Sequence, residues 1–214
     1  MTISVIWPHA RNRTDPRRRA PIGLGGALLL GGCVGAPQPS FDCRQPLGSV
    51  EALICQQEDL ALLDRQLEQT LHSALQRLTP PQQQHLRSGQ RDWLQQRDDC
   101  WNSDMQATCI AASYRYRIAE LQARYALVHT SGPFHYRCDH TDGDRVTATF
   151  YATDPASAVA TRGDDTQVLF LQSGDHGAQY QGGYVSLWVH GDEALIRWGP
   201  QAYGNPEMRC RIDP

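Results

Sequence analysis

The chain has 214 residues, 40% of them hydrophobic and 20% charged, which allows one or two globular domains and excludes a multispanning membrane protein. All 20 basic residues are arginines, so mechanisms that need a lysine, such as a Schiff base or a phosphate-binding loop, are excluded. The net charge of -3 is unevenly distributed: residues 1–32 carry +4 and the remainder carries -7. The acidic remainder is a poor partner for nucleic acid.

The first 32 residues have the pattern of a secretory signal peptide. Three arginines at 17–19 precede a glycine- and leucine-rich run at 20–32 that is too short to span a bilayer as a helix. The run ends in Leu30-Gly31-Gly32-Cys33, which resembles the lipobox of bacterial lipoproteins. An ordinary cleaved signal is the alternative.

The lipobox resemblance implies that Cys33 is lipidated and becomes the first mature residue. Residues 33–40 are then a lipidated linker that anchors the protein to a membrane of the bacterial cell envelope. Val34 is not the aspartate that retains many such proteins at the inner membrane, so we expect the outer membrane, facing the periplasm.

Six further cysteines, an even number, suit disulfide formation in an exported protein. Many pairings are possible in principle, and the positions of the six favour Cys43–Cys55, Cys100–Cys109 and Cys138–Cys210. A zinc site is the alternative reading of His135, Cys138 and His140. We expect no metal, because no second ligand pair matches this motif and Cys138 has an oxidative partner.

Residues 41–128 have a helical hydrophobic pattern. Leucines recur every three or four residues from Leu60 to Leu78, which predicts one amphipathic helix. Thr79 and Gln82 have the spacing of a capping box, with Pro80 at the first position of a second helix that runs toward Cys100. A third helix is expected from about Met105. Three such helices form a small disulfide-bonded bundle, whose core we expect to contain Trp93, Tyr114 and Tyr125.

Residues 133–214 alternate between apolar and polar side chains, as β-strands do, after a break at 129–133. Strands are indicated at 134–138, 146–150, 168–171, 184–189 and 194–198, separated by Gly- and Asp-rich turns. Short antiparallel strands at this spacing predict a small barrel or sandwich, which a Cys138–Cys210 bridge would close. The predicted fold class is therefore α+β, a helical bundle followed by an antiparallel β-barrel.

The helical half resembles a known family. The motifs that carry the resemblance are Cys43-x11-Cys55, Leu62-Leu63-Asp64, Gln90-x2-Trp93-Leu94-x2-Arg97-Asp98-x-Cys100, Cys109 and Tyr116-Arg117-Ile118-x2-Leu121. They are similar to the N-terminal domain of LprI-type lysozyme-inhibitor lipoproteins. The β half is similar to the MliC/PliC group of C-type lysozyme inhibitors. Its matching residues are Tyr136-x-Cys138, His176-Gly177-Ala178-Gln179-Tyr180, Trp188-Val189-His190-Gly191-Asp192-Glu193-Ala194 and Cys210.

The resemblance implies an eight-stranded barrel whose loops enter the lysozyme cleft and hydrogen-bond its catalytic carboxylates. The implied contacts are His176, Gly177 and Tyr180 in one loop, and His190 and Gly191 in a hairpin. His176 and His190 stand where the family has Ser and Lys. The two imidazoles either take over the contact, because each can donate to a carboxylate, or mark a barrel that has lost inhibition. In the second case the chain is an interaction lipoprotein that binds peptidoglycan or another envelope protein.

Charge gives weaker support for a lysozyme partner. The β half carries -5 and the segment 41–128 carries -2, and C-type lysozymes are strongly basic as a class. Asp192 and Glu193 do not indicate a glycosidase, because neighbouring strand residues face opposite sides of a sheet. Asp164 and Asp165 are interpreted as solvated loop residues. We therefore expect no catalysis, no cofactor and no small-molecule substrate.

Overall fold

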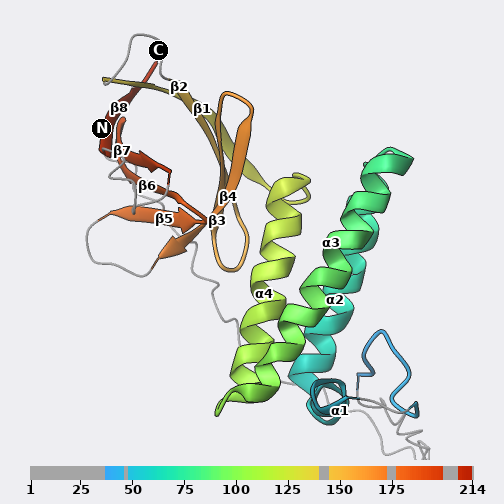
Figure 1. Ribbon diagram of the computed structural model, residues 1–214. Helices are drawn as coiled ribbons and strands as arrows, with labels where there is room; N and C mark the ends of the chain where they lie inside the picture. The colour runs from blue at the N-terminus through green and yellow to red at the C-terminus, as the bar shows by residue number, and fades with distance from the viewer. Residues whose placement is uncertain (1–36, 46–47, 140–144, 173–176, 200–206, 214) are drawn as a thin grey trace, which may run out of the picture. The chain divides into compact units, whose positions relative to one another are not determined.

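The computed structural model describes residues 37–45, 48–139, 145–172, 177–199 and 207–213 (Figure 1). Helices come first along the chain and β-strands second, so the predicted α+β fold class is confirmed. The predicted signal segment and lipidation site Cys33 lie outside the described residues, as do His140 and His176.

The helical part contains one more helix than the sequence predicted. The elements are α1 (Ser49–Gln56), α2 (Glu58–Leu75), α3 (Pro80–Asp98), the short 3-10 helix η1 (Asp99–Asn102) and α4 (Gln106–Arg124). The additional helix, α1, has eight residues, and its apolar residues Val50, Leu53 and Ile54 have helical spacing over little more than one turn. It is stabilised by burial of Val50 and Ile54 and by the disulfide between Cys43 and Cys55.

The predicted start of α3 is confirmed. Pro80 is the first helical residue, and the backbone N–H of Thr79 donates a hydrogen bond of 3.0 Å to Oε1 of Gln82. This bond is the return half of a capping box, which satisfies a donor that the helix itself leaves unpaired.

The core of the helical part is aromatic and aliphatic. The rings of Trp93 and Tyr114 lie edge to face with centroids 5.3 Å apart, and Tyr125 is partly buried against the same core. The expected core position of these three residues is therefore confirmed. Side chains of this core that are almost fully buried around them include Ile54, Leu60, Ala74, Ile110 and Leu121.

A buried charge lies inside this core. The Arg97 side chain is only 3% exposed, and its guanidinium donates to the Tyr114 hydroxyl at 2.9 Å, to Glu51 at 2.9 Å and to Asp98 at 2.6 Å. Because an unpaired buried charge is costly, this site depends on all three partners. Through them α3 is joined to α1 and α4.

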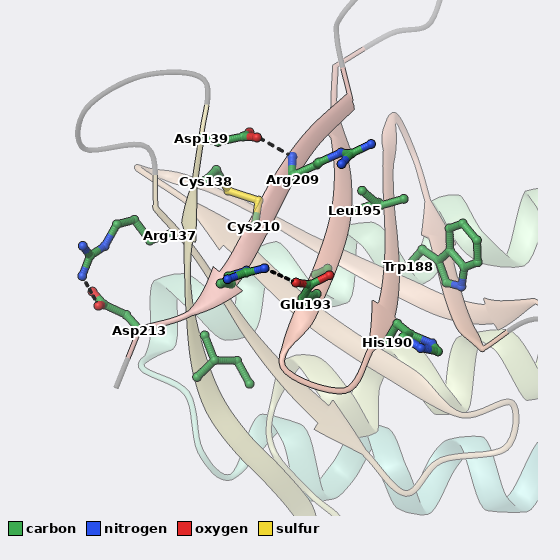
Figure 2. Close-up of a pocket in the computed structure, with 13 residues that line it drawn as sticks. Arg137, Cys138, Asp139, Trp188, His190, Glu193, Leu195, Arg209, Cys210 and Asp213 are labelled. Carbon is green, nitrogen blue, oxygen red and sulfur yellow. Dashed lines mark hydrogen bonds and ion pairs between the residues drawn. A yellow bond between two sulfur atoms is a disulfide. The ribbon is translucent and has the colours of Figure 1, made fainter.

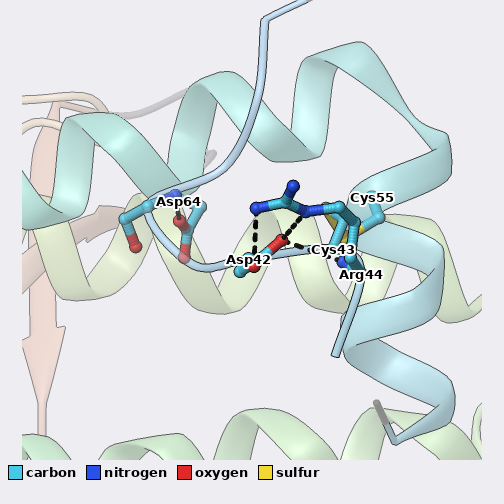
Figure 3. The surroundings of a disulfide bond; sticks show 6 residues. Asp42, Cys43, Arg44, Cys55 and Asp64 are labelled. Carbon is cyan, nitrogen blue, oxygen red and sulfur yellow. Dashed lines mark hydrogen bonds and ion pairs between the residues drawn. A yellow bond between two sulfur atoms is a disulfide. The ribbon is translucent and has the colours of Figure 1, made fainter. Parts of the chain in front are cut away.

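The network continues to α2 and to the segment before α1. Tyr114 donates to Oδ1 of the buried Asp64 at 2.8 Å, and the backbone N–H of Ser40 donates to its other oxygen at 2.6 Å. Figure 3 shows the Cys43–Cys55 disulfide next to the Asp42–Arg44 ion pair, and Asp64 in the same view. No described buried side-chain N or O atom is left without a hydrogen bond. The segment that leads into the bundle is thus held by a disulfide and by a buried carboxylate.

The β part is a closed barrel of eight antiparallel strands, each paired with its neighbours in the chain, with β1 also paired to β8. The strands are β1 (Thr130–Cys138), β2 (Arg145–Tyr151), β3 (Ser157–Arg162), β4 (Asp165–Gln172), β5 (Ala178–Gly182), β6 (Val185–His190), β7 (Glu193–Trp198) and β8 (Glu207–Ile212). This confirms the predicted barrel. The interior is filled by Tyr136, Val146, Ala148, Leu169, Leu187 and Ile196.

Strand β1 begins inside the segment that the sequence predicted as a break. The pairing with β2 shifts register between Ser131 and Phe134, which is a bulge. Gly132 has φ +107°, and a Cβ there would lie 2.9 Å from the Phe134 ring. Glycine and proline are tolerated in a strand at such a bulge, so the Gly132-Pro133 signal marks an irregularity within β1.

All three predicted disulfides are present. Cys138 and Cys210 are directly opposite each other in the β1–β8 pair, so their bond crosses the seam where the barrel closes.

Candidate functional site

The two segments that the sequence singled out meet at one end of the barrel. Ala178, the first residue of β5, pairs with Val189 of β6, so Gly177 is brought next to His190. Connections in an antiparallel barrel alternate between its two ends, and the β4–β5 and β6–β7 connections share an end. His176, which precedes Gly177, lies outside the described residues.

The β6–β7 connection is a two-residue turn that needs a glycine. His190 pairs with Glu193 across the turn, and Gly191 has φ +60° with open space where a Cβ would be. Glycine is required there by the backbone conformation of a tight hairpin and not by a close neighbour. The turn leaves His190 exposed on the outer face of the barrel.

Gly177 is required for a different reason. Its φ is +84°, and a Cβ at this position would lie 2.8 Å from the indole nitrogen of Trp188 and 3.2 Å from the Val189 carbonyl oxygen. Any side chain would therefore push the backbone at residue 177 away from β6. Glycine allows the backbone at this one position to lie directly against Trp188.

Tyr180 lies on the opposite side of β5 from this outer face. Its ring is 5.2 Å from the Phe150 ring, and it packs against the interior cluster of the barrel. Burial raises the pKa of the Tyr180 hydroxyl. The residues that the sequence predicted therefore lie on two sides of the sheet: His190 is on the outer face of the barrel, and the Tyr180 side chain points to the interior.

A groove of about 1020 Å³ runs over the outer face of β6, β7, β8 and β1 beside His190 (Figure 2). Strand register places Trp188, Leu195 and Arg209 in one row across it. His190, Glu193, Arg211 and Arg137 form a second row. Trp188, the one large aromatic side chain among the described residues that line the groove, is 38% exposed.

The charges of the groove are largely paired with each other. Arg211 bonds to Glu193, and Arg137 bonds to Asp213, which Arg145 also approaches at 3.6 Å. The Arg209 guanidinium has no ion-pair partner among the described residues. The sequence prediction missed Leu195, Arg209 and Arg211, although their alternation with buried Ala194 and Cys210 marks them as outward-facing.

The alternative chemistries fit the geometry poorly. Cys138 is bonded to Cys210, and the described part of the chain holds no group of three side chains that could bind a metal ion. Glu193, one of the two acids weighed for a glycosidase, is paired with Arg211.

Asp165 is more than the solvated loop residue that the sequence predicted. It accepts hydrogen bonds from the Tyr184 hydroxyl at 2.5 Å, from Gln167 at 2.7 Å and from the Trp198 indole at 3.0 Å. The bond from Tyr184 is the main cause that lowers the pKa of Asp165, with help from Gln167. This cluster lies at the end of the barrel away from His190 and joins β4, β7 and the β5–β6 turn.

Comparison with protein families agrees with this arrangement. Residues 43–121 match the family model described as lysozyme inhibitor LprI, and residues 136–204 match the model described as membrane-bound lysozyme-inhibitor of c-type lysozyme, MliC. The chain is therefore built from lysozyme-inhibitor domains, which are non-enzymatic. It contains an LprI domain, 43–121, followed by an MliC domain, 136–204.

No curated protein and no solved structure matches the chain significantly. None of the helices that the structure describes has the length and apolar character needed to cross a membrane.

Proposed function

We propose that this protein is a lipid-anchored inhibitor of C-type lysozyme in the bacterial cell envelope. The segment 173–180 and the hairpin 189–192 enter the cleft of the enzyme and block it. The observation that carries this proposal is the β5–β6 register, which brings Gly177 next to His190 at one end of the barrel. The MliC match over the same strands supports lysozyme as the target.

The two imidazoles provide the polar contacts in this mechanism. His190 is exposed beside the tight turn at Gly191, in a position to approach a carboxylate of the enzyme. His176 immediately precedes Gly177 in the sequence and is its proposed counterpart on the other segment. Imidazole donates a hydrogen bond to a carboxylate and adds a positive charge when protonated. Tyr180, packed on Phe150, supports the segment from beneath.

The anchor is the acylated Cys33. Each buried CH₂ of an acyl chain contributes about 0.8 kcal/mol, so several chains hold a protein stably at a membrane. The MliC family description, membrane-bound, agrees with such an anchor. Labelling cells with radioactive palmitate tests it: the protein should be labelled and Cys33→Ala should not, and label in both would contradict lipidation at Cys33.

Inhibition is tested by titrating residues 34–214, with disulfides formed, into a C-type lysozyme while lysis of cell walls is followed. We expect lysis to fall in proportion to added protein and to stop near equimolar amounts. Undiminished lysis in the presence of folded protein would contradict the proposal. It would favour the alternative, an interaction lipoprotein that binds peptidoglycan or another envelope protein, which sedimentation with purified peptidoglycan would then test.

A further inference from the structure

A second exposed apolar site lies in the helical part, far along the chain from the barrel loops. Trp101 in η1 and Met105 just before α4 are 59% and 68% exposed, the two most exposed large hydrophobic side chains among the described residues. Tryptophan and methionine are enriched at protein–protein interfaces, where a partner buries them. We refer to residues 99–106 as the α3–α4 tip.

The backbone of the α3–α4 tip is held by one disulfide and two hydrogen bonds. The disulfide between Cys100 and Cys109 spans it, and the Ser103 hydroxyl oxygen accepts a hydrogen bond of 3.1 Å from the Met105 backbone. The Gln106 side chain donates a bond of 2.8 Å to the carbonyl of Trp101. Because the backbone around both exposed side chains is already fixed, little conformational entropy is lost when a partner covers them.

The charge around the tip is negative. Asp99 and Asp104 are exposed, and neither has an ion-pair partner within the described residues. Arg97, the nearest arginine in sequence, is buried and bonded to Asp98, so it does not neutralise them. A surface of this kind repels anionic lipid headgroups and attracts a basic protein.

We propose that the α3–α4 tip is a second contact surface for the basic lysozyme, with Trp101 and Met105 as apolar anchors and Asp99 and Asp104 as an acidic rim. This inference rests on the proposed function and assigns part of lysozyme recognition to the helical part. A partner can bury the exposed tryptophan, which would then act as an interface anchor. The unpaired carboxylates beside it would accelerate association with a basic protein.

The test measures binding of residues 34–214 to a C-type lysozyme by surface plasmon resonance. Trp101→Ala should weaken affinity about tenfold or more, as expected for an interface anchor, and Trp101→Phe should restore part of it. Leu62→Ala removes another exposed apolar side chain, on α2, and is the matched control, with no change expected. The pair Asp99→Asn and Asp104→Asn should mainly slow association and reduce its dependence on salt.

The results separate the two proposals. Wild-type protein that does not bind lysozyme would overturn both. Wild-type binding that is weakened by His190→Ala and unchanged by Trp101→Ala would support the barrel loops and overturn the role of the tip. Flotation with neutral or anionic lipid vesicles completes the test: vesicle binding lost in Trp101→Ala, with lysozyme affinity unchanged, would assign the tip to a membrane and overturn the inference.

Discussion

The hydroxyl of Tyr114 donates a hydrogen bond of 2.8 Å to the Asp64 carboxylate and accepts one of 2.9 Å from Arg97. One phenol therefore links a buried anion to a buried cation. Burial is the main cause that raises the pKa of the Tyr114 hydroxyl, so it stays protonated and remains a donor throughout the physiological range.

Replacing Tyr114 by Phe should destabilise the protein by about 1–3 kcal/mol, because Asp64 and Arg97 each lose a partner in a buried site. Urea denaturation followed by far-UV circular dichroism measures the change. Tyr116→Phe is the control. Tyr116 lies in the same helix and its side chain is exposed, so this change should have little effect on the free energy of unfolding. Equal effects of the two changes would mean that the buried network contributes nothing specific.

Asp165→Asn should change how stability depends on acid. The pKa of Asp165 is lowered in the folded protein, so its ionised form stabilises the fold above the unfolded value of about 3.9. That contribution is lost as pH falls through the lowered folded pKa. Below about pH 4, we expect the urea concentration at the unfolding midpoint to decrease more steeply with falling pH in the wild type than in Asp165→Asn. Asp164→Asn, an exposed neighbour, should behave like the wild type.

Gly177→Ala separates close packing from backbone conformation. A left-handed conformation costs a non-glycine residue about 1–2 kcal/mol, and at Gly177 the added Cβ also meets the Trp188 indole. Gly163 has φ +58° and no atom within 4 Å of an added Cβ, so Gly163→Ala is destabilised only by the left-handed backbone conformation. Gly177→Ala should therefore lower the free energy of unfolding more than Gly163→Ala, and should shift the tryptophan fluorescence. Equal losses would show that the contact with Trp188 is unimportant.

Removing the Cys138–Cys210 disulfide of the barrel should lower the thermal stability more than removing the Cys100–Cys109 disulfide of the helical part. The sequence separations are 72 and 9 residues. On the loop-entropy model the longer bridge contributes about 4 kcal/mol and the shorter one about 3. Thermal denaturation of the two double alanine variants compares them, and a larger loss for Cys100/Cys109 would contradict this order.

His190→Lys tests whether a charged imidazole contacts the enzyme. An imidazole changes its charge within the range that the experiment covers, whereas a lysine ammonium stays charged throughout it. Lysozyme affinity of the wild type should weaken as pH rises from 5 to 8, and that of His190→Lys should weaken less. His85→Ala, on an exposed position of α3, controls for charge elsewhere on the surface. A wild-type affinity that does not change with pH would exclude the imidazolium contact.

Local signals in the sequence account for most of the fold. The capping box at Thr79 and the leucine periodicity of α2 predicted features that depend on neighbours in the chain, and the even number of cysteines also predicted the long-range Cys138–Cys210 bond. Three strands, β3, β5 and β8, are not among the ranges that the sequence indicated. In β3 the inward residues, Ala158 and Ala160, are too small to show a hydrophobic alternation. Burial of Arg97 was also hidden, since only the assembled bundle supplies its three partners.

The candidate site also contains residues that the sequence indicated and residues that only the folded barrel brings together. Gly177 and His190 were found through the family resemblance, and strand register confirmed that Gly177 and the His190 turn share one end of the barrel. The groove beside them depends on β8 pairing with both β7 and β1. That pairing joins residues far apart in the chain, so Arg209 and Arg211 carried no local sign that they line a groove.

The closed ladder of the barrel restricts how any partner can bind. Each of the eight described strands has a hydrogen-bonded neighbour on both sides, so none of them presents a free edge. A partner cannot extend the sheet by adding a strand of its own, as many peptide-binding domains allow. Recognition by the described strands must therefore use side chains and turns, and these strands offer no edge at which two copies of the barrel could pair.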